Sequence, residues 1–347
     1  MTVKVSGFDF VEQRLQWYRT ITLNRLLEVL PSREPKRYLY DLMPDYPERP
    51  GKGLRAALCF ATCKAYGGNI RLALNSAVAI ELLHNGFLIH DDIQDESLFR
   101  RGDSTLYKKY GTGVAINVGN ALNLLSLRLL MENRELLGPH LSWQVFTETA
   151  EMLRQTLEGQ AMELGWIRDN ACDLTDLDYL RMSLKKTSWY TCIYPCRIGA
   201  LIATGGAINP DRFHRFGWYL GIAFQIQDDL LNLLGDYTIY GKEIRGDIWE
   251  GKRTLMLIHL LNNCVDNEKA QVKSFLSLPR KERLNEDVEW IYELMIKYSS
   301  IEFARRCARK FAGAALHEFL FAYGDLPDSE DKQFILETIL YTIERDR

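Results

Sequence analysis

Residues 76–95 read Ser-Ala-Val-Ala-Ile-Glu-Leu-Leu-His-Asn-Gly-Phe-Leu-Ile-His-Asp-Asp-Ile-Gln-Asp. Apolar side chains recur in this stretch at the spacing of one helix face, at Val78, Leu82, Leu83, Phe87 and Leu88. The stretch ends in carboxylates: Asp91 and Asp95 are four residues apart, and Asp92 is adjacent to Asp91. Since residues four apart share a helix face, the pattern predicts an apolar helix that ends in a cluster of acidic side chains.

Three carboxylates this close together repel one another unless a cation lies among them. Dense negative charge and oxygen ligands suit Mg²⁺, especially when substrate phosphates complete its coordination. A solvated acidic surface is the alternative, and for a lone cluster it would be the better interpretation. The apolar run that leads into these carboxylates favours a metal site.

A second stretch repeats this arrangement much later in the chain. It reads Phe224-Gln225-Ile226-Gln227-Asp228-Asp229-Leu230-Leu231-Asn232, with two adjacent aspartates and an amide oxygen at the position of the last carboxylate. Residues 217–234 also repeat apolar positions at helical spacing. Two such helices facing each other would form a cavity with carboxylates on both rims, where metal ions could clamp one diphosphate.

The rest of the sequence also favours helices. Prolines are absent from residues 51–138 and 211–278, which leaves room for long helices because proline is costly in a helix interior. Strand-like alternation is nearly absent. We therefore expect an all-α, single-domain bundle of long helices around a central cavity, spanning residues 1–347. Residues 1–50 would form N-terminal helices and a Pro-rich loop, and residues 333–345 a last helix after a polar break.

Composition narrows the function classes. Hydrophobic residues make up 47% of the chain, and 43 Lys and Arg face 46 Asp and Glu, so no basic excess indicates a nucleic-acid partner. The pairs Cys59/Cys63 and Cys192/Cys196 lie in apolar helical patterns, which indicates buried thiols in place of disulfides or zinc ligands. Neither a signal peptide nor an uninterrupted apolar run of membrane-spanning length is visible. We expect a cytoplasmic protein without a membrane span.

Basic residues accompany the two acidic clusters, at Lys52, Arg55, Arg100, Arg101, Lys186, Lys242 and Lys252. Taken singly, each is an ordinary surface charge. Arginine binds phosphate oxygens with a fork of donors and lysine acts as a point charge, so their combination with two Asp-rich helices predicts a diphosphate site.

At these residues the sequence resembles the trans-isoprenyl diphosphate synthases, also called the polyprenyl synthetase family. The resemblance runs from about Tyr46 to Leu260 and is weaker towards the C-terminus. Its motifs occur in the family's order: Gly51-Lys52-x-x-Arg55, Glu81-Leu82-Leu83-His84, Asp91-Asp92-x-x-Asp95, Arg100-Arg101-Gly102, Lys186-Thr187, Phe224-Gln225-x-x-Asp228-Asp229, and Gly241-Lys242 through Gly246-Asp247 to Glu250-Gly251-Lys252. Two departures are visible: Ala56 stands where the family often has proline, and Gly102-Asp103-Ser104-Thr105 replaces the usual Gly-x-Pro-Thr.

The resemblance implies the isoprenoid synthase fold and a role for each matching position. Three Mg²⁺ ions per active site would be held by Asp91, Asp92, Asp95 and Asp228, with Asp229 and Asn232 supporting the second rim. The allylic diphosphate would contact Arg100, Lys186, Lys242 and Lys252, and isopentenyl diphosphate would contact Lys52, Arg55, His84 and Arg101. Thr187 and Gln225, beside Lys186, would line the region where positive charge develops.

The resemblance further implies a homodimer that condenses an allylic diphosphate with isopentenyl diphosphate and releases diphosphate. One helical turn before the first cluster, Gly86 leaves space and Phe87 removes it, which favours geranylgeranyl diphosphate as the product and farnesyl diphosphate as the next candidate. Phe87 could instead face a neighbouring helix and only fill the core.

Three other functions remain open. A class I terpene cyclase would use the same aspartates but would not need a second diphosphate site. A metal phosphohydrolase, inferred from His84, His90, Asp91 and Asp228, would leave the second aspartate pair unexplained. A catalytically silent regulatory partner would not need intact aspartates on both rims.

Overall fold

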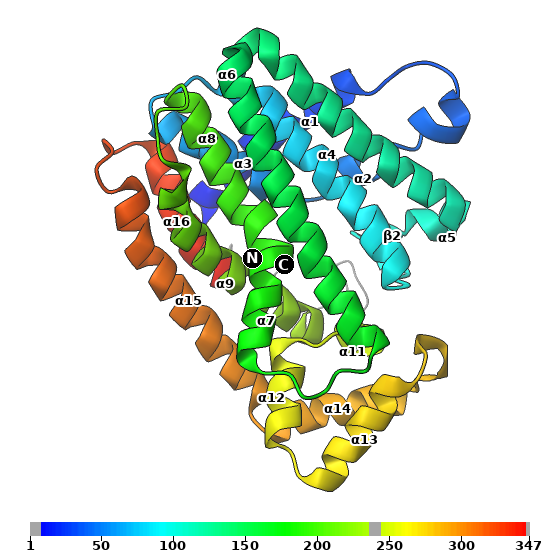
Figure 1. Cartoon of the computed structure of the whole chain (residues 1–347). Coiled ribbons are helices and arrows are strands. Elements are labelled where there is room, and N and C mark those ends of the chain that lie inside the picture. The colour runs from blue at the N-terminus through cyan, green and yellow to red at the C-terminus, as the bar shows by residue number, and fades with distance from the viewer. Residues whose placement is uncertain (1–7, 236–243, 345–347) are drawn as a thin grey trace, which may run out of the picture.

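The computed structural model describes residues 8–235 and 244–344, and helices dominate it (Figure 1). Short π or 3₁₀ segments are labelled η. The N-terminal part contains α1 (Asp9–Val29), η1 (Lys36–Tyr40), α2 (Asp45–Glu48), α3 (Leu54–Ala65), α4 (Ile70–Gln94), β1 (Phe99–Arg100), β2 (Asp103–Ser104) and α5 (Leu106–Tyr110). The middle contains α6 (Thr112–Arg168), α7 (Asp176–Ser183), η2 (Leu184–Ile193), α8 (Tyr194–Ala203), η3 (Pro210–Phe213) and α9 (His214–Leu234). The last part contains α11 (Gly246–Glu250), α12 (Leu255–Asn263), α13 (Asp266–Ser277), η4 (Arg280–Glu282), α14 (Asn285–Lys297), α15 (Ser300–Tyr323) and α16 (Glu330–Glu344).

The two helices that carry the acidic motifs, α4 and α9, form where the apolar spacing predicts them. The side chain of Asn69 caps α4 by accepting the backbone N–H of Arg71 at 3.0 Å. α4 packs along α6, while α9 packs against α15 and η2. The predicted all-α class is confirmed, and both motifs lie at the C-terminal ends of buried helices.

The longest helix, α6, is bent in its middle. Gly138 adopts φ 78° and ψ 167°, and Pro139 follows it. Proline has no N–H to donate and clashes with the preceding turn, so the first half of α6 ends there and the second half starts in a new direction. Only the second half contributes side chains to the acidic end of the cavity described below.

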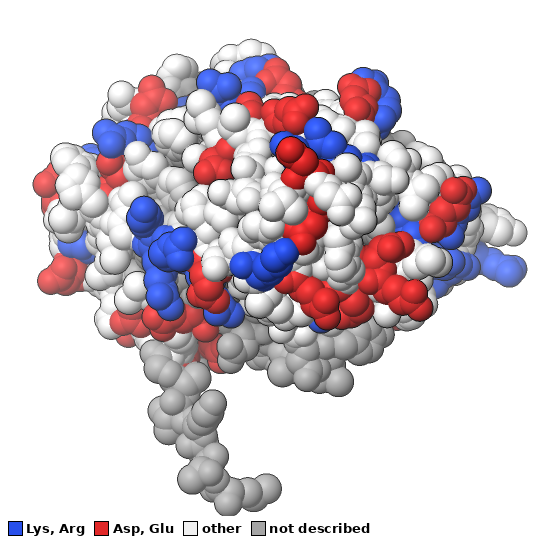
Figure 2. Space-filling model, turned by 90° about the horizontal axis from the view of Figure 1, so that it is seen from below, with Lys and Arg blue, Asp and Glu red and all other residues white. Residues whose placement is uncertain are grey.

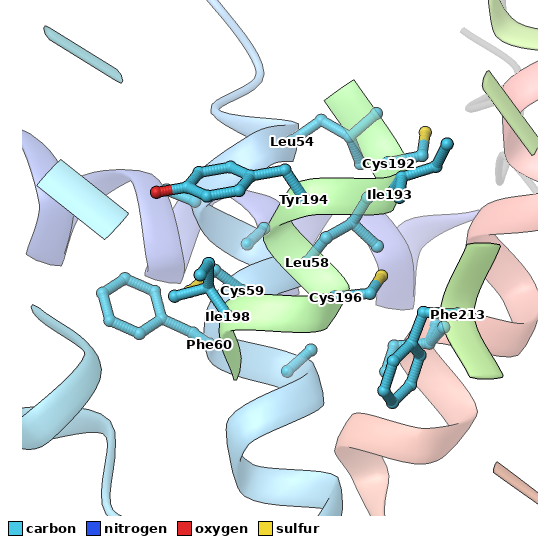
Figure 3. Packing of buried hydrophobic residues seen from close by; sticks show 14 of the residues in the cluster. Leu54, Leu58, Cys59, Phe60, Cys192, Ile193, Tyr194, Cys196, Ile198 and Phe213 are labelled. Carbon is cyan, nitrogen blue, oxygen red and sulfur yellow. The ribbon is translucent and has the colours of Figure 1, made fainter. Parts of the chain in front are cut away.

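Glycines allow helices to approach closely in the core and around the π-helix η2. In the core of Figure 3, α3 meets α8 at Gly199, where a Cβ atom would lie 2.3 Å from the carbonyl oxygen of Cys59. Gly159 of α6 approaches the backbone of Lys186 in the same way, and Gly221 of α9 approaches Ser188. The segment η2 is therefore held between α6 and α9.

The cysteines behave as predicted. All seven are free thiols, and Cys59, Cys63, Cys192 and Cys196 are buried in the core between α3, η2 and α8 (Figure 3). Burial raises the pKa of Cys63 to about 12 and that of Cys196 to about 11. These side chains are packing residues and poor nucleophiles.

Three local expectations differ from the structure. The segment Tyr46–Pro50, predicted as a loop, begins inside the short helix α2. A two-residue antiparallel ladder joins β1 to β2 immediately after the first acidic motif, because the tight turn at Arg101 and Gly102 brings Phe99 opposite Ser104. The last helix begins at Glu330, three residues before its predicted start.

Two helices, α4 and α6, are long and apolar enough to cross a membrane by length and composition. Such helices are weak indicators, because core helices of soluble proteins meet the same criteria; the apolar window of α4 is 78% buried inside the protein, and that of α6 is 44% buried. On the face drawn in Figure 2, acidic and basic side chains are interspersed.

Candidate active site

A cavity of about 590 Å³ lies between α4, α6, η2 and α9. It brings together most of the residues predicted from the sequence: Lys52, Arg55, His84, Asp91, Arg100, Arg101, Lys186, Thr187, Gln225, Asp228, Asp229 and Lys252. Asp92, Asp95 and Asn232 lie beside this cavity without lining it. Lys242 falls outside the described residues.

The first rim combines two predicted carboxylates with one that sequence reasoning missed. Carboxylate oxygens of Asp91, Asp95 and Glu163 all lie within 4.8 Å of one another. Burial, reinforced by the charge of Asp91, raises the pKa of Asp95 to about 8. Crowded carboxylates are a donor set that a hard divalent cation would stabilise, so these residues fit Mg²⁺.

Asp92 has a different environment from its neighbours. It is completely buried, accepts a hydrogen bond from the Tyr46 hydroxyl at 2.5 Å, and accepts another from Arg100 Nε at 2.9 Å. The same Arg100 guanidinium reaches Asp91 at 3.5 Å. In this structure Asp92 orients Arg100 towards the first rim.

The second rim contains Asp228, Asp229 and Asn232, and hydrogen bonds hold the last two side chains. Asp228 lines the cavity. Asp229 accepts hydrogen bonds from the Tyr179 hydroxyl at 2.8 Å and from Gln225 Nε2 at 2.7 Å, while burial raises its pKa to about 7. Asn232 Oδ1 accepts the backbone N–H of Asp247 at 2.9 Å and so connects α9 to the start of α11.

Two half-buried lysines lie beside the first rim. Lys252 Nζ lies 2.6 Å from Asp95 and 2.9 Å from Glu250, and Lys186 Nζ pairs with Glu163 and lies 3.6 Å from Asp91. Burial alone would lower the pKa of Lys186, but Glu163 and Asp91 raise it above its ordinary value. Both lysines therefore carry full positive charge next to the acidic cluster.

The π-helix η2 places Thr187 opposite α9. The Thr187 hydroxyl donates to Gln225 Oε1 at 2.5 Å, and Gln225 in turn donates to Asp229. π-helical turns occur often at functional sites because they turn side chains away from the regular helical register. The hydrogen-bonded side chains of Thr187, Gln225 and Asp229 line the cavity near the second rim.

A separate group of cations lies at the α3 end of the cavity. Arg55 Nη1 is 3.2 Å from His84 Nε2, Arg101 Nη2 is 3.5 Å from the same atom, and Arg55 also donates to the Tyr190 hydroxyl at 2.7 Å. Burial, and then the charges of Arg55 and Arg101, lower the pKa of His84 well below its usual range. His84 is thus a neutral acceptor that holds two guanidinium groups together. Lys52 lies at this end too, with its Nζ 5.0 Å from the Tyr341 ring centroid.

The structure gives a physical reason for Ala56 at a position where the family often has proline. The backbone N–H of Ala56 donates to Glu81 Oε1 at 3.3 Å, a bond that proline could not make. Glu81 lines the same end of the cavity.

Residues 36–295 match the sequence profile of the polyprenyl synthetases. The chain belongs to the polyprenyl synthetase family. The synthetase is 33% identical over 272 residues to the geranylgeranyl diphosphate synthase of Saccharolobus solfataricus, covering 77% of this chain and 78% of that one. It is 28% identical over 322 residues to the geranylfarnesyl diphosphate synthase of Aeropyrum pernix, covering 89% and 98%. The crystal structure of geranylgeranyl pyrophosphate synthetase from Pyrococcus horikoshii has 28% identity and a TM-score of 0.85, over 98% of this chain and 100% of that one.

Membership in this family makes the protein an isoprenyl diphosphate synthase, a transferase of prenyl groups acting on allylic and isopentenyl diphosphates. The isoprenoid synthase fold expected from the resemblance is confirmed.

The synthetase carries Phe87 in the wall of its cavity. The ring lies edge-on to Tyr190, with centroids 5.9 Å apart, and Phe87 both lines the cavity and packs against the core. Gly86 does not widen the cavity as expected, because Asn123 of α6 occupies the space beside it; a Cβ on Gly86 would lie 2.3 Å from Asn123 Oδ1. Asn123 itself lines the cavity.

Sequence reasoning missed Glu163, Gln160 and Tyr46. Gln160 Nε2 lies 3.4 Å from Asp91 Oδ1 and 2.7 Å from Gln94 Oε1. The available signal was Gly159-Gln160-x-x-Glu163, a glycine followed by two polar residues three apart on one helix face. Tyr46 had no signal, because its role depends on a fully buried hydroxyl that only the fold reveals.

Proposed function

We propose that this enzyme extends an allylic diphosphate with isopentenyl diphosphate to form geranylgeranyl diphosphate. One observation carries the proposal: a single cavity joins a carboxylate-rich end, with Asp91 and Asp228 on opposite helices, to a separate cationic end around Arg55 and Arg101. A terpene cyclase or a phosphohydrolase would have no use for the second end.

The carboxylate-rich end would bind the allylic diphosphate. Asp91, Asp95 and Glu163 on one side and Asp228 on the other would hold three Mg²⁺ ions, which supply charge neutralisation of the leaving diphosphate when bound. The cations oriented towards this end would contact the diphosphate oxygens, namely Arg100, Lys186, Lys252 and, by family resemblance, Lys242. Asp92, Asp229 and Asn232 would support the two rims through the hydrogen bonds described above.

The cationic end would bind isopentenyl diphosphate. Arg55 and Arg101 offer forked donors, Lys52 adds a point charge, and neutral His84 keeps the two guanidinium groups at a common spacing despite their repulsion. Binding an anion here would relieve that repulsion.

Bond formation then needs positioning and charge stabilisation by the chain. The carbon–oxygen bond of the allylic diphosphate breaks, the isopentenyl double bond supplies the electron pair of the new carbon–carbon bond, and a proton leaves to the released diphosphate. The oxygens of Thr187 and Gln225 would stabilise the positive charge that develops between the two ends.

Product length would be set at the apolar side of the cavity by Phe87 and Asn123. The similarity to geranylgeranyl diphosphate synthases supports a twenty-carbon product. The similarity to a geranylfarnesyl diphosphate synthase shows that related sequences also belong to enzymes named for a longer product. Phe87→Ala should lengthen the products, because removing a half-buried ring from the cavity wall opens space that an apolar chain can fill. Chromatography of the dephosphorylated products measures the chain length, and Tyr38→Ala, which removes an exposed ring, is the control.

The reaction itself is tested by incubating the purified chain with Mg²⁺, labelled isopentenyl diphosphate and an allylic primer. We expect label in a linear twenty-carbon diphosphate. A cyclic hydrocarbon without label, release of phosphate alone, or no reaction would instead indicate a cyclase, a phosphohydrolase or a silent partner.

We further propose that residues 1–347 form one domain in a cytoplasmic homodimer. Large apolar side chains exposed along α6 support the dimer: Ile116, Leu124, Met131, Leu136 and Trp143. A second copy placed on α6 would cover one of the two helices that are long enough to cross a membrane. Light scattering should give twice the chain mass; recovery of the protein with added lipid vesicles would contradict the proposal.

A further inference from the structure

The short segment from Arg245 to Lys252 bridges the two rims. At its start, the backbone N–H of Arg245 donates to the Asn232 carbonyl at 2.7 Å, and that of Asp247 donates to Asn232 Oδ1 at 2.9 Å. At its end, Lys252 reaches Asp95 of the first rim at 2.6 Å. The position of Lys252 and Asp247 in the cavity therefore depends on how this segment is held.

The side chain of Arg245 anchors this segment to α14, outside the cavity. Arg245 does not line the cavity, and its guanidinium instead lies over the Tyr292 ring of α14, 4.0 Å from the ring centroid, where it also pairs with Glu289. The ring stacking and the ion pair act on the same planar guanidinium group and together fix its orientation. Arginine suits this position because its guanidinium can stack on a ring and pair with a carboxylate at once.

The backbone of Arg245 adds an independent observation. It adopts φ 61° and ψ 21°, the left-handed region that disfavours residues with a Cβ, although the next residue is glycine. A side chain is retained in this conformation when its contacts offset the strain, and such residues gather at functional sites. The contacts with Glu289 and Tyr292 are the compensating interactions.

We propose that Arg245 is a positioning residue for allylic diphosphate binding, acting through Asp247 and Lys252. This inference rests on the proposed function, and it goes further by assigning a role to a residue outside the cavity. The isopentenyl end is built from α3, α4 and the β1–β2 turn, whereas the side chain of Arg245 contacts Glu289 and Tyr292 of α14. The effect should therefore be confined to one of the two substrates.

The test compares full-length variants by their separate KM values. Arg245→Ala should raise the KM for the allylic diphosphate about tenfold, as expected for loss of a residue that orients a binding group, with the KM for isopentenyl diphosphate changed less than twofold. Arg245→Gly removes the strain together with the contacts and should give the same shift. Arg245→Lys keeps a cation near Tyr292 and Glu289 and should recover most of the loss. Arg305→Ala, which removes an exposed pair with Glu302, is the matched control.

A second readout does not depend on turnover. With Mg²⁺ present, inorganic diphosphate should raise the melting temperature of the wild type and of Arg305→Ala more than that of Arg245→Ala. Glu289→Gln tests the same contact from the other side, should the arginine variants fold poorly, and should reproduce part of the shift.

Equal rises in both KM values, unchanged KM values, or a Gly variant with wild-type binding would overturn the role of Arg245. Failure of the wild type to condense the two substrates would instead overturn the proposed function, so the two failures are distinguishable.

Discussion

The acidic motifs of α4 and α9 look alike in sequence but differ in their surroundings. In α4, Asp91 and Asp95 meet Glu163 from α6 to form a compact cluster, and Asp92 is buried against Tyr46 and Arg100. In α9, Asp228 and Asp229 both line the cavity, and Asp229 and Asn232 tie α9 to η2, α7 and α11. Spacing determines which side chains share a face, but partners from other elements determine the surroundings of each carboxylate.

The largest effect should come from Asp91 and Asp228, which line the cavity on opposite rims. We expect Asp91→Asn and Asp228→Asn to lower turnover by about a thousandfold, because each removes charge stabilisation of the leaving diphosphate. Steady-state assays at saturating Mg²⁺ measure this, and Asp169→Asn, which alters an exposed pair with Arg168, is the control. If Asp228→Asn lost only a few-fold, the second rim would not be part of the clamp.

Asp92 should differ from Asp91 by affecting stability more than chemistry. Asp92→Asn leaves buried Arg100 without its main partner and should lower the free energy of unfolding by about 3 kcal/mol. Asp103→Asn, which alters an exposed pair with Lys109, should change it by less than about 1 kcal/mol. Chemical denaturation with turnover per folded molecule separates the two quantities. A thousandfold loss of turnover with unchanged stability would make Asp92 equivalent to Asp91.

Glu163 sharpens the comparison, because α9 has no counterpart of it in the described residues. Glu163→Gln should raise the Mg²⁺ concentration needed for half-maximal activity by about thirtyfold, since it removes one donor of the cluster and the partner of Lys186. Glu158→Gln lies on the same helix, but its partners Arg154 and Lys185 are at the surface. Identical Mg²⁺ dependence in both variants would exclude Glu163 from the site.

Asn232 should give the smallest effect. Asn232→Ala removes the acceptor for the Asp247 N–H and should raise the KM for the allylic diphosphate about fivefold, equal to about 1 kcal/mol for one hydrogen bond. Asn232→Asp keeps an acceptor oxygen and should stay within about twofold of the wild type. Kinetics with each substrate varied in turn test this, and a loss as large as that of Asp228→Asn would make Asn232 a metal ligand.

Much of the fold and site could be predicted from the sequence, because α4 and α9 combine strong helical spacing with motifs in a characteristic order. Residues that act through contacts between distant elements could not. Tyr46 reaches Asp92 across 46 positions, and Asn123 fills the space beside Gly86 only because α6 packs on α4. The left-handed Arg245 also lies outside sequence reasoning, since nothing in Arg245-Gly246 indicates which of the two residues adopts that conformation. Lys242 stays a prediction, as do the metal and substrate roles of the other site residues.

The central claim is that the two rims bind one diphosphate together with Mg²⁺. Titration calorimetry of inorganic diphosphate into the wild type, Asp91→Asn and Asp228→Asn tests it most directly. The account predicts binding to the wild type only when Mg²⁺ is present, and loss of that binding in both variants. Metal-independent binding, or wild-type affinity in Asp228→Asn, would contradict it.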